Sequence, residues 1–80
     1  MAINTIESPM PGIFYTRASP SDPPLKQPGD TVAVGDSIGL IEVMKSFMPI
    51  HATAAGRLVR FLVEDQASVD VGDPICEVEG

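Results

Sequence analysis

An internal repeat constrains the fold of this chain more than any other feature of its sequence. The segment Val32-Ala33-Val34-Gly35-Asp36-Ser37-Ile38 recurs as Val69-Asp70-Val71-Gly72-Asp73-Pro74-Ile75, at an offset of 37 residues. Upstream, Pro11-Gly12-Ile13-Phe14 is similar to Ala55-Gly56-Arg57-Leu58, at an offset of 44 residues. Self-similarity at a nearly constant offset predicts two copies of one structural unit that is rich in β-hairpins.

The two offsets differ by seven residues (44 minus 37), so the first copy contains an insertion that the second copy lacks. It lies between Gly12 and Val32, in a stretch whose prolines remove backbone donors and exclude a central strand. We predict a protruding loop over residues 18–26, which are Ala18, Ser19, Pro20, Ser21, Asp22, Pro23, Pro24, Leu25 and Lys26.

Short apolar runs alternate along the chain with Gly, Pro and Asp, which is typical of a β-sandwich or barrel. No stretch has a clean helical period with capping residues, so the predicted fold class is all-β. The expected strands are Ile3–Ile6, Gly12–Tyr15, Thr31–Val32, Ser37–Val43, Phe47–Ala52, Gly56–Leu62, Ser68–Val69 and Pro74–Glu79.

Composition narrows the class of protein. The chain has 80 residues with one cysteine and one histidine, which predicts a single domain over residues 1–80 without an internal disulfide or a zinc site. A net charge of −6 argues against nucleic-acid binding, which needs cationic side chains. The first residues form neither a basic leader nor a long apolar run, which predicts a cytoplasmic protein that does not bind membranes.

Gly-Asp pairs mark the predicted turns, at Gly29-Asp30, Gly35-Asp36 and Gly72-Asp73. Glycine supplies positive φ, and aspartate can close a turn onto nearby backbone amides. We interpret these pairs as turn chemistry and not as metal or phosphate sites, because neither a calcium-loop spacing nor a phosphate-binding glycine loop is present.

Lys45 lies at the seam between the two copies. The strands expected on either side leave room only for a tight turn, with Met44 and Lys45 at its tip. A two-residue hairpin loop needs positive φ at both positions, which is unfavourable for residues with side chains. That cost suggests that the turn serves to present the lysine.

The residues around this turn resemble a known family. Glu42-Val43-Met44-Lys45 is similar to the Glu-Ala-Met-Lys-Met motif of biotinyl domains, which are found in biotin-dependent carboxylases. Ser8-Pro9-Met10-Pro11-Gly12-Ile13-Phe14-Tyr15 is similar to the Ser-Pro-Met-x-Gly-x-Phe-Tyr segment of the biotin carboxyl carrier proteins of acetyl-CoA carboxylase. The resemblance implies a flattened β-barrel, or barrel-sandwich hybrid, of two pseudo-symmetric four-stranded halves.

The resemblance also implies a function. Lys45 would carry covalent biotin at the 44–45 turn, and a biotin protein ligase would recognise Glu42, Val43, Met44 and Ser46. Val43 and Ser46 depart from the alanine and methionine usual in the family. Residues 18–26 would form the thumb that lies over the biotin ring in acetyl-CoA carboxylase carriers.

Such a carrier is not itself an enzyme. The resemblance implies that it would take carboxybiotin from a biotin carboxylase subunit to a carboxyltransferase subunit of an acetyl-CoA carboxylase, for fatty acid synthesis. Two alternatives stay open: a lipoyl-bearing carrier domain, and an unmodified barrel-sandwich domain used for protein contacts.

Other side chains receive structural interpretations. Met48, Cys76 and most of the aromatic side chains are expected in the core, with support of the thumb as the second possibility for Tyr15. His51 is expected to lie on a strand surface or to be satisfied by a hydrogen bond, and not to act as a base. Glu42 is interpreted either as a solvated strand residue or as a charge that excludes the wrong ligase or contacts a partner.

Overall fold

The computed structural model describes residues 2–19 and 21–80, and every regular element in that part of the chain is a β-strand. No helix of the described chain has the length and apolar character needed to cross a bilayer. The strands agree with the sequence prediction to within one residue at each end. They are β1 (Ile3–Glu7), β2 (Gly12–Tyr15), β3 (Thr31–Val32), β4 (Ser37–Val43), β5 (Ser46–His51), β6 (Gly56–Phe61), β7 (Ser68–Val69) and β8 (Pro74–Glu79).

The strands form two four-stranded antiparallel sheets, in the orders β1-β8-β6-β3 and β5-β4-β2-β7. The repeat explains these orders, because β2 lies between β4 and β7 just as β6 lies between β8 and β3. Hydrogen bonds follow the same rule: the Phe14 amide donates to the Ala67 carbonyl at 2.8 Å, and the Leu58 amide to the Asp30 carbonyl at 2.9 Å. The predicted all-β fold of two pseudo-symmetric halves is confirmed.

The hydrophobic core contains residues from both halves of the repeat. Its buried side chains are Ile6, Phe14, Val32, Ile38, Ile41, Ile50, Ala52, Leu58, Val69, Ile75, Cys76 and Val78. Phe61 packs against this core with its ring centroid 5.9 Å from that of Phe14. Cys76 packs as a small apolar residue, and burial raises the pKa of its thiol to about 11, so the thiolate is disfavoured.

Aspartate side chains close the turns, as predicted. The Oδ2 atom of Asp36 accepts a hydrogen bond from the Ala33 amide at 2.9 Å, and Oδ2 of Asp73 accepts one from the Asp70 amide at 2.8 Å. The glycines in these turns, Gly35 and Gly72, have φ of 94° and 86°. These contacts account for both Gly-Asp pairs without a ligand.

The Asp36 turn should make stability depend on pH. Its hydrogen bond from the Ala33 amide and the nearby Lys26 ammonium, at 3.3 Å, lower the pKa of Asp36 below 3.8. Because the folded pKa is below the unfolded one, the stabilisation is complete above about pH 4 and is lost as the pH falls through the folded pKa. Urea unfolding of Asp36→Asn should therefore show a smaller loss of stability between pH 5 and pH 2 than the parent, and equal losses would contradict this assignment.

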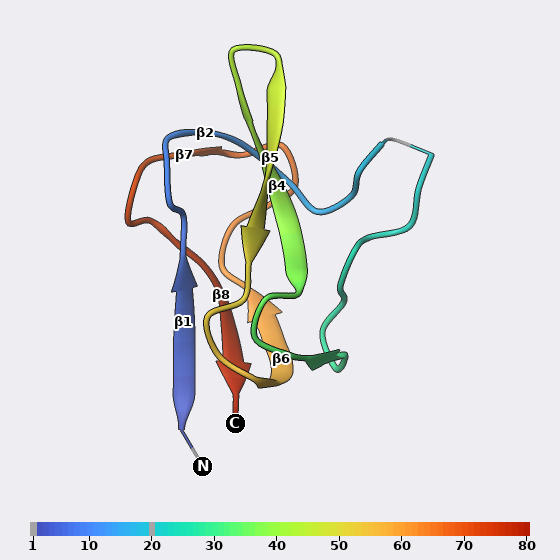
Figure 1. Cartoon of the computed structure of the whole chain (residues 1–80), viewed down its shortest axis with the longest axis vertical. Coiled ribbons are helices and arrows are strands. Elements are labelled where there is room, and N and C mark those ends of the chain that lie inside the picture. Colours follow the sequence, from blue (N-terminus) through green and yellow to red (C-terminus); the bar gives the residue numbers. More distant parts are fainter. Residues whose placement is uncertain (1, 20) are drawn as a thin grey trace.

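The chain between β2 and β3 leaves the sheets as a long excursion, drawn in cyan in Figure 1. It contains the predicted thumb, residues 18–26, of which Pro20 lies outside the described residues. The neck of the excursion is held by the Leu25 amide, which donates to the Thr16 carbonyl at 2.8 Å, and by the ion pair of Lys26 with Asp36. These two contacts fasten the C-terminal end of residues 18–26 to Thr16 and to the turn before β4.

The two ends of the described chain lie beside each other. Ala2 and Gly80 exchange amide-to-carbonyl hydrogen bonds, each 3.0 Å long. Figure 1 shows both termini at one end of the long axis of the molecule and the β4–β5 hairpin at the other. The long axis measures 38 Å, so the hairpin tip is far from both termini.

A lysine-bearing hairpin as the candidate functional site

The β4–β5 hairpin ends in a two-residue loop formed by Met44 and Lys45. Val43 pairs with Ser46 and Glu42 with Phe47, which leaves these two residues at the tip. Their φ angles are 50° and 69°, so both adopt the left-handed conformation that a twisted two-residue hairpin requires. The predicted strained turn is confirmed, at a cost of about 1–2 kcal/mol for each residue.

Exposure at the tip differs between neighbouring residues. Met44 is 93 % exposed, and Lys45 and Ser46 are also exposed. Val43 is partly buried and packs against the core. The hairpin therefore anchors itself through Val43 and presents the next three residues to solvent. That these residues are recognised by a ligase, and that Lys45 is the attachment point, remain predictions.

Glu42 has a partner within the chain that neither sequence interpretation anticipated. Its Oε1 atom accepts a hydrogen bond of 2.8 Å from the Tyr15 hydroxyl, which connects β4 to β2. This hydrogen bond, followed by desolvation and the negative charge of Glu42, raises the pKa of Tyr15. Glu42 is thus neither fully solvated nor free, and it braces the base of the hairpin.

The expectation that Met48 and most aromatic side chains lie in the core was wrong for Met48, for Phe47 and for the half-buried Tyr15, which is not among the core residues or the side chains packed against them. Met48 is 45 % exposed and Phe47 is 54 % exposed. Both belong to β5, an edge strand of its sheet, and the hairpin extends beyond the body of the molecule, as Figure 1 shows. The first part of β5 therefore has no second layer to cover it. Phe47 packs instead on Tyr15, with ring centroids 5.6 Å apart.

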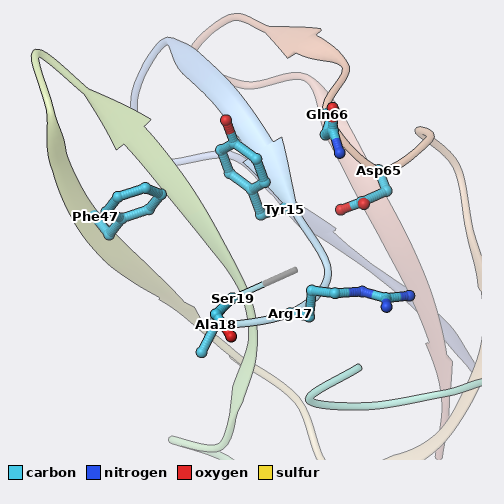
Figure 2. A pocket seen from close by; sticks show the side chains of 7 residues that line it. All are labelled: Tyr15, Arg17, Ala18, Ser19, Phe47, Asp65 and Gln66. Atoms are coloured by element: carbon cyan, nitrogen blue, oxygen red, sulfur yellow. The ribbon is translucent and has the colours of Figure 1, made fainter. Parts of the chain in front are cut away.

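A pocket of about 200 Å³ lies between the hairpin and the start of the thumb. Figure 2 shows Phe47 on one side, the Tyr15 ring in the middle, and Asp65 and Gln66 on the other side. Arg17, Ala18 and Ser19 line the remaining wall. Of these residues, the sequence predicts only Ala18 and Ser19 in the site, as part of the thumb, with support of the thumb as a second possibility for Tyr15.

The loop after β6 is attached to the base of the thumb. Oδ1 of Asp65 accepts hydrogen bonds from the Thr16 amide at 2.7 Å and the Thr16 hydroxyl at 3.2 Å. No local sequence pattern predicts this contact, because the two residues are 49 positions apart. His51 is exposed on β5, as expected, and does not line the pocket.

The geometry fits covalent attachment of an acyl group. Lys45 lies exposed at the tip of the β4–β5 hairpin, where a second protein can reach it without deforming the sheets. Acylation of an amine requires an activated acyl donor and a partner that removes the proton. The turn supplies the position and the accessibility of Lys45 to such a reaction.

Comparisons with known proteins agree with this geometry. The sequence model of the family described as "Biotin-requiring enzyme" (Biotin_lipoyl) matches residues 4–78. Among curated proteins, the biotin carboxyl carrier protein of acetyl-CoA carboxylase from Pyropia yezoensis is 37 % identical over 94 % of this chain and 48 % of its own length. The protein of the same name from Haemophilus influenzae is 34 % identical over 92 % of this chain and 48 % of its own length.

A chloroplastic protein of that name from Glycine max is 35 % identical over 92 % of this chain and 28 % of its own length. This chain thus spans less than half the length of these curated relatives. Among solved structures, the urea carboxylase of Kluyveromyces lactis superposes with a TM-score of 0.81 at 26 % identity, over 99 % of this chain and 6 % of that protein. The family match, taken together with these carrier-protein relatives, confirms biotin as the predicted cofactor, and on these grounds the chain belongs to the biotin-requiring enzyme family.

Proposed function

We propose that this chain is the biotin carboxyl carrier of a biotin-dependent carboxylase of the acetyl-CoA type, with biotin in amide linkage to Lys45. The observation that carries the proposal is the position of Lys45. It is the second residue of a two-residue loop at positive φ, at the far end of the molecule from both termini. The identity of 32–37 % to carriers of acetyl-CoA carboxylase favours that acceptor over urea.

The role of the chain in this function is mechanical. The bound cofactor supplies a ring nitrogen that can accept and give up a carboxyl group. Val43 and the Tyr15–Glu42 hydrogen bond hold the hairpin, and Met44 and Ser46 offer a biotin protein ligase an exposed surface on either side of Lys45. The domain itself catalyses neither carboxylation nor carboxyl transfer.

Two larger partners would perform those steps, a biotin carboxylase subunit and a carboxyltransferase subunit, in the cytoplasm and for fatty acid synthesis. A tethered cofactor reaches both active sites at a high effective concentration and is not lost to solution. The net charge of −6 would alter the rate of docking more than its strength. Residues 18–26 would serve as the thumb over the biotin ring.

Selective modification tests the proposal against both alternatives. The purified chain is incubated with ATP and either a biotin protein ligase and biotin, or a lipoate ligase and lipoate, and its intact mass is measured. We expect one biotinyl increment in the first reaction and no change in the second. A lipoyl increment would instead identify a lipoyl carrier, and an unchanged mass in both reactions would identify an unmodified interaction domain.

A further inference from the structure

Gln66 adopts a backbone conformation that side chains disfavour. It lies in the loop between β6 and β7 with φ of 71°, and the repeat places it 37 residues after Gly29, whose φ is 97°. The two amides make equivalent hydrogen bonds, from Gly29 to the Leu58 carbonyl at 2.8 Å and from Gln66 to the Phe14 carbonyl at 2.6 Å. Both copies of the repeat thus require positive φ at this position. The first copy has glycine there, and the second has Gln66, a residue with a side chain.

Lack of space does not explain the difference between the halves. A Cβ atom built on Gly29 would meet no atom within 4 Å, so a side chain would fit there. Glycine is the residue expected at such a position, since other residues pay a conformational cost. Residues with side chains that are held in a disfavoured backbone conformation are concentrated at functional sites. Gln66 is therefore a candidate for a role beyond the fold.

The side chain of Gln66 lines the pocket beside the lysine hairpin, on the side opposite Phe47 (Figure 2). Phe47 follows Lys45 by two residues, roughly 7 Å at the rise of a β-strand. A lysine side chain lengthened by an acyl chain can therefore fold back from the tip into this pocket. The occupant that the geometry favours is the group on Lys45 of the same chain.

The lining of the pocket suits a small planar polar ring. Tyr15 and Phe47 offer aromatic surfaces, and the Gln66 amide offers both a donor and an acceptor. The ureido ring of biotin has one carbonyl acceptor and two N–H donors, which match the donor and the acceptor of the Gln66 amide.

We propose that Gln66 is a positioning residue, which hydrogen-bonds the ureido ring of biotin on Lys45 and holds the ring against Tyr15 and Phe47. This inference rests on the proposed function, because it requires biotin at Lys45. The docked ring is shielded from water between visits to partner active sites, and it must leave the pocket to react.

The experiment uses the biotinylated chain, with complete modification verified by intact mass for each sample. Nuclear Overhauser effects are then measured between the ureido N–H protons and the ring protons of Tyr15 and Phe47. The variants are Gln66→Met, which keeps the length of the side chain but removes its donor and its acceptor, and Gly29→Gln, which places the glutamine side chain at the equivalent position away from the pocket. We expect cross-peaks in the parent and in Gly29→Gln, and a docking equilibrium constant about fivefold lower in Gln66→Met, the effect of one lost hydrogen bond.

Gln66→Gly separates this role from a purely structural one. Glycine adopts positive φ without a conformational cost, so the midpoint of urea unfolding should rise. The docked population should fall, because the amide side chain is lost. Cross-peaks that are absent from the fully biotinylated parent, or that persist unchanged in both Gln66 variants, would overturn the inference. Because modification is verified first, such a failure leaves biotin attachment standing, whereas failure of attachment is visible in the mass alone.

Discussion

Replacing Lys45 with arginine is expected to abolish biotinylation completely and to leave the fold intact. Arginine keeps the positive charge and the exposed position at the tip, and its guanidinium group does not replace the amine in amide formation. Stability should change by less than about 0.5 kcal/mol, because the side chain is exposed. Intact mass after co-expression with a biotin protein ligase measures the modification, and urea unfolding measures stability.

The chain contains its own control for this prediction. Lys26 is the only other lysine in the sequence, and Lys26→Arg should retain a full biotinyl increment. Carboxyl transfer with partner subunits should be lost with Lys45→Arg and kept with Lys26→Arg. A biotinyl increment that persists in Lys45→Arg would remove Lys45 from the site.

Gly12→Ala is expected to destabilise the domain by about 3 kcal/mol or more. A Cβ atom at Gly12 would lie 2.5 Å from the Glu42 carbonyl oxygen and 2.5 Å from Cγ2 of Ile41. The first contact is backbone and the second is core, so neither can move without disturbing the pairing of β2 with β4. Overpacking of this kind is among the more destabilising single changes. The free energy of urea unfolding provides the measurement.

Gly35→Ala is the matched control. Gly35 also has positive φ, at 94°, but a Cβ atom there would meet nothing within 4 Å. The free energy of unfolding of Gly35→Ala should therefore fall by about 1 kcal/mol, the cost of backbone strain alone. Equal losses for the two variants would show that conformational freedom, and not the close approach of β2 to β4, is the reason for glycine at position 12.

The strands could be predicted because two local signals coincide with the repeat. Gly-Asp turns end the strands in both copies, and the matching offsets fix which strands are equivalent. The two-residue loop at Met44 and Lys45 could be predicted because very few residues separate the two strands in the sequence. These features depend on neighbouring residues, which sequence patterns describe well.

The pocket could not be predicted, because it is made by contacts between distant segments. The Tyr15–Glu42 bond depends on the register of β2 against β4, and the Asp65–Thr16 contact joins a loop to the neck of the thumb. The prediction that Met48 and Phe47 are buried was wrong because their apolar character does not reveal how far the hairpin extends. The β4–β5 hairpin extends beyond the other sheet, which therefore does not cover these two side chains. Gln66 did leave a signal, since the repeat aligns it with Gly29.

The reciprocal bonds between Ala2 and Gly80 have a practical consequence for use of this domain as a tool. A fluorescent protein or affinity tag fused to either terminus would begin at the end of the molecule opposite the β4–β5 hairpin (Figure 1), whose loop contains Lys45. Biotin captured on a streptavidin-coated sensor would then hold every molecule in one orientation, with the fused cargo facing away from the support.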